Sequence, residues 1–162
     1  MKRVTVIVVN WNGKRFLSEC LESLNNQRYR DFSTVVVDNG SEDDSVVFIE
    51  QHFPEVRLIR MYHNTGFAYA NNIALKELDT EYAALFNNDA VADEKWLESL
   101  VNALDKCPEA GMAGSKMLFY DAKNMIDRVG DAYSTAGTGL LRGRGMPSES
   151  YNIPEKIFGA CA

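Results

Sequence analysis

The feature that most constrains this chain is a regular alternation of short apolar strands with segments of helical periodicity. The run VTVIVV at 4–9 consists entirely of β-branched residues, a pattern typical of a strand that is buried on both faces of a sheet. Apolar residues then recur at helical spacing over 14–26. The same alternation continues, with strands predicted at 33–37, 56–60, 81–86 and 110–118 and helices over 41–54, 67–78 and 93–108.

This order of elements predicts an α/β fold, a Rossmann-like and mostly parallel sheet with helices on both faces. Ser41 and Asp93 are expected to cap the helices that follow them, because short polar side chains accept hydrogen bonds from the first free amides of a helix. The α/β pattern covers residues 1–120, and residues 121–162 are expected to be loop-rich. Within them, the Gly- and Ser-rich stretch 134–150 is expected to be a long mobile loop.

Charge and cysteine usage narrow the classes of partner and the compartment. The formal net charge of −6 disfavours nucleic acid, whose binding depends on basic contacts to phosphate. The three cysteines are scattered and suggest reduced thiols in the cytoplasm. The apolar run at 4–9 is too short for a signal peptide or a spanning helix. A cytoplasmic location is therefore predicted, with peripheral association at the inner face of the membrane left open.

Polar residues follow each of the first four predicted strands. In an open parallel sheet, ligands bind beyond the carboxyl ends of the strands, where this chain places 10–13, 38–41, 63–66 and 87–89. Any one of these segments is explained by the preference of Asn, Asp and Gly for turns. Together they favour a binding site, and Trp11 adds an aromatic face on which a base or sugar can stack.

Several common site signatures are absent from the sequence. No G-x-x-x-x-G-K-[ST] motif occurs, and no G-x-G-x-x-G follows the first strand, which disfavours a nucleoside triphosphatase and a dinucleotide dehydrogenase. There is no G-x-S-x-G motif, and neither His52 nor His63 has an evident catalytic partner. A Ser or Cys nucleophile is therefore unsupported.

Four segments in order resemble the nucleotide-binding half of a family-2 glycosyltransferase with the GT-A fold: VTVIVVNWNG, VVVDNGSEDDS, HNTGFAYANNIAL and LFNNDA. Within that family they are most similar to rhamnosyltransferase-like members. The resemblance implies that residues 1–120 form the nucleotide-sugar-binding domain and that 121–162 are the incomplete start of the acceptor-side region. The resemblance implies transfer of a sugar, with inversion, from a dTDP- or UDP-linked donor to a hydroxyl of a glycan or lipid-linked acceptor. It also implies a role in polysaccharide or cell-surface glycan synthesis, and usually a bound Mg²⁺ or Mn²⁺.

The same resemblance assigns the individual site residues. Val9 and Trp11 would flank the nucleobase, and Asp38 would accept its imide N–H. Asn88 and Asp89 fall where the family has a DxD-type acidic motif, and Asp89 would ligate the Mg²⁺ or Mn²⁺ ion. The alignment with this motif is ambiguous by one residue, so Asn87 could equally be its first member. Asn88 would contact the ribose or a metal-bound water, and Asn71 stands where many relatives have a basic residue. The residues implied to bind the nucleotide are Val9, Asn10, Trp11, Asp38, Asn64, Gly66, Asn71 and Asn88.

An inverting transferase also needs a carboxylate that takes the proton from the acceptor hydroxyl. In relatives this base follows a segment similar to IFGACA, which here occupies 157–162. We therefore expect the base beyond Ala162, and interpret the chain as the donor-binding part of a longer enzyme. A catalytically inactive nucleotide-sugar-binding module remains an alternative. A nucleotidyltransferase is less favoured, because it would require a Gly- and Arg-rich phosphate loop after the first strand.

Overall fold

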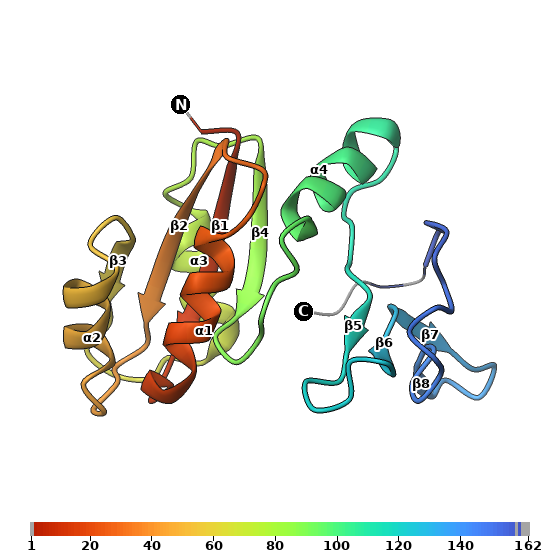
Figure 1. Ribbon diagram of the computed structural model, residues 1–162. Coiled ribbons are helices and arrows are strands. Elements are labelled where there is room, and N and C mark those ends of the chain that lie inside the picture. The colour runs from red at the N-terminus through yellow and green to blue at the C-terminus, as the bar shows by residue number, and fades with distance from the viewer. Residues whose placement is uncertain (1, 158, 160–162) are drawn as a thin grey trace. The chain divides into compact units, whose positions relative to one another are not determined.

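The computed structural model describes residues 2–157 and 159. The chain divides into two compact units, Met1–Leu97 and Glu98–Ala162, which are coloured from red to green and from green to blue in Figure 1. This division of the backbone falls before residue 120. The assignment of donor binding to 1–120 and of the acceptor side to 121–162 concerns function and stays a prediction.

The first unit contains a four-stranded parallel sheet. Its order is β3-β2-β1-β4, so that β1 lies inside the sheet and β3 and β4 lie at its edges. The strands are β1 (Val4–Asn10), β2 (Phe32–Asp38), β3 (Arg57–Arg60) and β4 (Tyr82–Asn87). The α/β fold with a parallel sheet that the sequence predicts is therefore confirmed.

Helices cover both faces of this sheet. Figure 1 shows α1 (Lys14–Asn25) in front of the sheet and α3 (Phe67–Leu75) behind it. Helix α2 (Ser45–His52) packs against α1. Helix α4 (Trp96–Lys106) begins at the end of the first unit. The result is a three-layer arrangement in the first unit, with the sheet in the middle.

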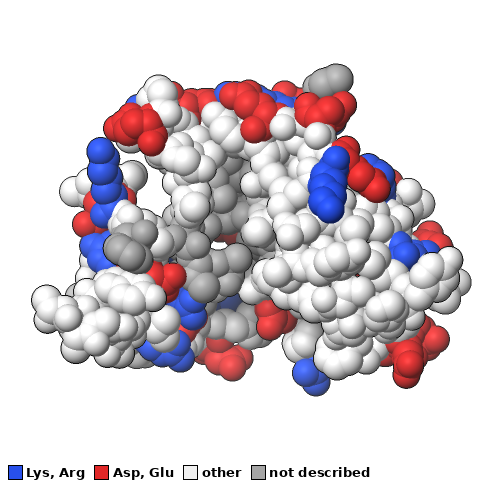
Figure 2. Space-filling view, turned by 180° about the vertical axis from the view of Figure 1, so that it is seen from behind, with Lys and Arg blue, Asp and Glu red and all other residues white. Residues whose placement is uncertain are grey.

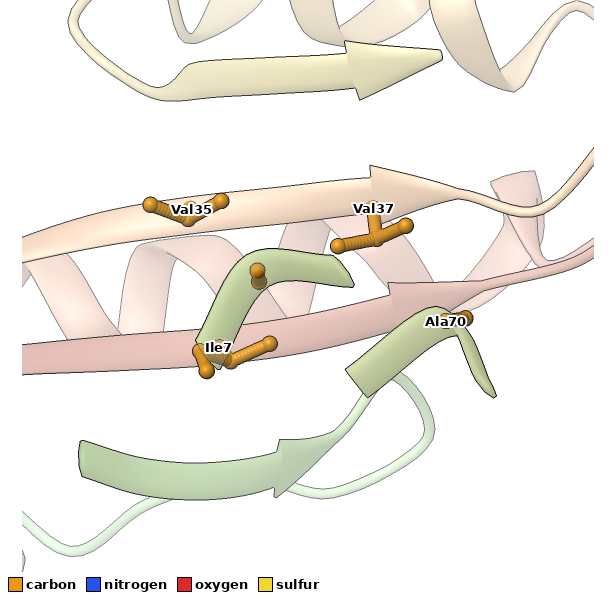
Figure 3. Packing of buried hydrophobic residues seen from close by; sticks show 5 residues of the cluster. Ile7, Val35, Val37 and Ala70 are labelled. Atoms are coloured by element: carbon orange, nitrogen blue, oxygen red, sulfur yellow. The ribbon is translucent and has the colours of Figure 1, made fainter. Parts of the chain in front are cut away.

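The buried core explains the β-branched composition of β1. Ile7 packs with Val35, Val37 and two alanines of α3 on one face of the sheet, and Figure 3 shows four of these residues by name. Its neighbours Val6 and Val8 point to the opposite face by strand alternation and are also fully buried. The one polar residue inside this strand, Thr5, is buried as well, and its hydroxyl accepts a hydrogen bond from the Thr80 hydroxyl at 3.2 Å.

The beginning of α2 differs from the prediction. Ser41 does not cap this helix, because its hydroxyl accepts hydrogen bonds from Asn10 and Asn12 at the end of β1. The helix begins at Ser45, after Asp44 in the left-handed region at φ 61°. By contrast, the Asp93 carboxylate accepts the Lys95 N–H at 2.9 Å, just before α4 begins.

The second unit also differs from the prediction. Of the strand expected at 110–118 only β5 (Met117–Leu118) forms, and it pairs antiparallel with β6 (Ile126–Arg128) outside the parallel sheet. The expected long loop at 134–150 contains β8 (Gly139–Leu141), which pairs antiparallel with β7 (Asp131–Tyr133). Strands of two or three residues leave no detectable periodicity, which is why the sequence pattern missed them. Within the described part of the chain, no helix is long and apolar enough to cross a membrane.

The burial of Ile7 leads to a prediction about the free energy of unfolding. Ile7→Ala should lower the free energy of unfolding by about 2–5 kcal/mol, because a fully buried side chain leaves a cavity when it is truncated. Leu85→Ala is the matched control, since Leu85 is the β4 partner of Ile7 in register but is 38% exposed. It should cost less than about 1 kcal/mol. Denaturant unfolding measures both, and equal losses would contradict this description of the core.

Candidate functional site

The parallel register brings the ends of the strands to one edge of the sheet. Asn10 at the end of β1 is paired with Asp38 at the end of β2, and Val9 is paired with Asn87 at the end of β4. Asp38 is in turn paired with Arg60 at the end of β3. The segments that follow these strands therefore emerge at the same edge, as the sequence predicts.

Asn10 is the centre of a buried polar network at this edge. Its side chain is 0% exposed. Its Nδ2 donates to Asp38 Oδ2 at 3.1 Å and to Ser41 Oγ at 3.2 Å, and its Oδ1 accepts from Asn88 Nδ2 at 2.9 Å. One amide thus joins the ends of three strands, β2, β1 and β4. This burial leaves Asn10 little surface with which to touch a nucleotide directly.

Asp38 lies in the same network and is only 2% exposed. Besides the Asn10 bond, its Oδ1 accepts the Ser41 N–H at 3.0 Å. Both carboxylate oxygens are therefore already bonded to protein donors. The second contact also holds the turn after β2 against the end of that strand.

Asn39 fastens the loop before α3 to the end of β2. It is 2% exposed, and its Oδ1 accepts both the N–H and the hydroxyl of Thr65 at 2.9 Å. Its Nδ2 donates to Asn64 Oδ1 at 3.0 Å. The next residue, Gly40, has φ 79°, and a Cβ there would lie 2.6 Å from the His63 backbone. Only glycine fits so close an approach.

Sequence reasoning grouped Asn39 with turn-forming residues and missed its role. The sequence signal that could have indicated this role is the order Asp38-Asn39-Gly40 directly after a buried strand.

The role of Asp43 was also missed in the sequence. Its carboxylate accepts the Lys14 N–H at the start of α1 and bonds the Ser45 hydroxyl at the start of α2. Burial raises the pKa of Asp43, but these hydrogen bonds outweigh it and hold the pKa below its usual value.

The exposed members of the predicted site surround this buried network. The Trp11 indole is 55% exposed, and Asn64, Gly66 and Asp89 are exposed as well. Val9 and Asn88 are half-buried. Asn71 is set apart, because it is buried and donates through Nδ2 to the Phe67 carbonyl within α3 at 2.9 Å. The surface available to a ligand therefore comes from the ends of β1 and β4 and the loop before α3.

Cys20 of α1 lies beneath the end of β4. Its thiol donates to the Asn87 carbonyl with an Sγ to oxygen distance of 3.7 Å. Burial, followed by the negative charge of Asp89, raises the pKa of the Cys20 thiol to about 12. A thiol with that pKa stays protonated at neutral pH, so Cys20 is a packing residue and not a nucleophile.

The end of β4 offers oxygen ligands suited to a hard cation. Asp89 provides an exposed carboxylate next to the amides of Asn87 and Asn88. Among the described residues, no group of three or more His, Cys, Asp or Glu side chains could hold a metal ion by itself. Mg²⁺ usually binds through one or two carboxylates together with phosphate oxygens of a ligand. The residues present therefore fit a divalent ion that a phosphorylated ligand helps to hold.

The surface charge does not favour binding of a polyanion unless a divalent cation accompanies it. On the face drawn in Figure 2, Lys and Arg are interspersed with Asp and Glu among uncharged residues. Arg3, Arg28 and Arg57 of the first unit each form an ion pair with a glutamate. A diphosphate at the strand ends would depend on local donors and on a cation for its neutralisation.

Comparison with known proteins identifies the family. Residues 5–161, nearly the whole chain, match Glycosyl transferase family 2. The chain belongs to this family.

Individual relatives of this family 2 chain support the assignment. It is 34% identical over 93 residues to the teichoic acid poly(glycerol phosphate) polymerase of Staphylococcus epidermidis, covering 55% of this chain and 13% of the relative. A crystal structure of S. aureus TarS 1–349 matches with a TM-score of 0.59 and 26% identity, covering 65% of this chain and 33% of the 1–349 chain. These TarS structures include complexes with UDP and with UDP-GlcNAc.

A second solved relative carries a metal ion. The mannosyltransferase PcManGT from Pyrobaculum calidifontis, in complex with GDP-Man and Mn²⁺, matches with a TM-score of 0.60 and 28% identity, covering 63% of this chain and 32% of PcManGT. The fold is thus GT-A-like over part of the chain. The chain spans 13% of the length of the polymerase, 20% of TarS and 32% of PcManGT.

The Asn39 contacts make a prediction about the loop before α3. Asn39→Ala should raise the hydrogen-exchange rate of the Thr65 amide, because it removes the oxygen that this N–H bonds. It should also cost about 0.5–1.5 kcal/mol of stability for each hydrogen bond that the buried Asn39 side chain loses. The control is Asn72→Ala on the exposed side of α3. If both variants leave Thr65 exchange unchanged, Asn39 does not hold the loop.

Proposed function

We propose that this chain is the donor-binding part of an inverting glycosyltransferase that uses a nucleotide-diphosphate sugar. The observation that carries the proposal is the joining of three strand ends by the Asn10 side chain, which places Trp11 and Asp89 on the same edge of the sheet. Membership of family 2 supplies the reaction class. The nucleotide sugars bound by TarS and PcManGT support the class of donor.

Asp89 and Asn88 would hold the divalent ion together with the donor diphosphate. A bound Mg²⁺ or Mn²⁺ supplies positive charge that offsets the charge developing on the leaving diphosphate. The chain's own contribution is to place one carboxylate and one amide at the end of an edge strand. The PcManGT complex with Mn²⁺ supports this requirement for a metal.

Trp11 and Val9 would contact the nucleobase from the end of β1. The exposed indole offers a stacking face for a pyrimidine of a UDP- or dTDP-linked donor. Asp38 is proposed to recognise the base as well, and its burial favours an indirect role through the turn that it holds. Asn64 and Gly66, in the loop fastened by Asn39, would approach the nucleotide from the other side of β2.

The acceptor side of the reaction is proposed from the relatives. The acceptor is proposed to be a hydroxyl of a glycan or of a lipid-linked acceptor, and the teichoic acid polymerase among the relatives supports a role in cell-surface polysaccharide synthesis. Transfer of rhamnose is the finer form of this proposal, and rests on the sequence resemblance alone. A lipid-linked acceptor would bring the enzyme to the inner face of the membrane as a peripheral protein.

The metal assignment can be tested with the chain itself. Asp89→Asn should abolish the gain in uridine diphosphate affinity that Mn²⁺ provides, because the substitution removes the only carboxylate at the end of β4. Asp79→Asn is the matched control. It makes the same change of charge at an exposed position that precedes the amino-terminal end of β4, whereas Asp89 follows the carboxyl end of the same strand. Calorimetric titration with and without Mn²⁺ measures the gain.

Both variants should unfold at the same temperature as the unmodified chain, since both side chains are exposed. A gain from Mn²⁺ that survives in Asp89→Asn would remove Asp89 from the metal site. Loss of the gain in Asp79→Asn would show that net charge, and not a ligand at the end of β4, controls binding.

A further inference from the structure

We propose that Asn10 is a positioning residue that fixes the direction of the Asn88 amide, so that Asn88 presents its oxygen to a ligand beside Asp89. Gly13 makes this contact sterically possible. The inference rests on the proposed function only for the identity of the ligand. The direction of the amide itself follows from contacts within the first unit.

The direction is set by the Asp38 carboxylate, which can only accept hydrogen bonds when it is ionised. Asn10 must therefore turn its NH₂ group toward Asp38, and the observed Nδ2 to Oδ2 distance is 3.1 Å. The reversed amide would place two acceptor oxygens against each other in a buried site. The contact with Ser41 does not oppose this choice, because a hydroxyl both donates and accepts.

The orientation of the Asn10 amide in turn determines the orientation of the Asn88 amide. With its NH₂ group committed to Asp38, Asn10 has only Oδ1 left to face β4, and Asn88 must donate to it through Nδ2 at 2.9 Å. Asn88 Oδ1 is then the atom that is not engaged with Asn10. A carbonyl-type oxygen next to the Asp89 carboxylate suits a hard cation or a ribose hydroxyl, whereas an NH₂ group could not ligate a cation.

Gly13 leaves the space in which this contact forms. A Cβ at this position would lie 2.1 Å from Asn88 Nδ2 and 2.5 Å from Asn10 Oδ1. The backbone of Gly13 has φ −111° and ψ 19°, a conformation that other residues also adopt. The reason for glycine here is therefore the close approach of the Asn10 and Asn88 side chains, and not the backbone angle.

The first test needs no ligand. In the unmodified chain the side-chain NH₂ of Asn88 should exchange with solvent at least about tenfold more slowly than that of exposed Asn72, because one of its protons is hydrogen-bonded. Asn88→Ala identifies the signal by removing it. Gly13→Ala should abolish the protection. Gly111→Ala should not, since a Cβ at Gly111 would have no atom within 4 Å.

The second test measures metal binding separately from nucleotide binding. Gly13→Ala should lower the affinity for Mn²⁺ in the presence of saturating uridine diphosphate by about tenfold or more, which is typical when a residue that orients a metal ligand is disturbed. Affinity for uridine diphosphate without metal should change by less than about twofold. A purely structural role for Gly13 would reduce both affinities by the same factor, and that result would overturn the proposal.

A third variant keeps the proposal falsifiable if Gly13→Ala does not fold. The double substitution Asn10→Asp/Asp38→Asn exchanges the two groups, so that position 10 still presents an oxygen to Asn88. It should keep the Asn88 NH₂ protected, and fast exchange in this folded variant would overturn the proposal. If the unmodified chain binds no uridine diphosphate with Mn²⁺, the proposed function fails, while the exchange measurements still decide the direction of the amide.

Discussion

The in-register parallel pairing of β1 with β2 and β4 is the constraint on which the rest of this structure depends. It ends three strands at one level and puts Asn10 between Asp38 and Asn88. A buried amide there must satisfy both its donor and its acceptor, because an unpaired polar group in the interior costs about 1–3 kcal/mol. The hydrogen bonds that satisfy Asn10 also hold the ends of the strands together. Fold stability and site geometry therefore depend on the same contacts.

The site is built in two layers that do different work. Asn10, Asp38 and Asn39 are buried and bond to protein groups, so they fix the backbone around them. Trp11 and Asp89 project from that fixed backbone into solvent. Groups held in place before a ligand arrives lose less conformational entropy when it binds. This arrangement suits a site whose charged ligand is completed by a cation.

The sequence could predict the sheet because its information lies in long, strongly periodic segments. The β-branched run at 4–9 and the helical spacing of 14–26 specify burial without reference to distant residues. Ser41 was misassigned as a helix cap because its bonding partner, Asn10, lies on another strand. The strands of the second unit are only two or three residues long and depend on pairing across the chain. Contacts of that kind leave no local pattern.

We propose that the carboxyl edge of the parallel sheet binds a nucleotide diphosphate together with a divalent cation. Titration of the ¹⁵N-labelled chain with uridine diphosphate and Mg²⁺, followed by backbone amide chemical shifts, tests this claim most directly. We expect the largest changes at 10–13, 38–41, 64–66 and 87–89, with small changes in the second unit. Saturable changes centred elsewhere, or no change at millimolar nucleotide, would contradict it.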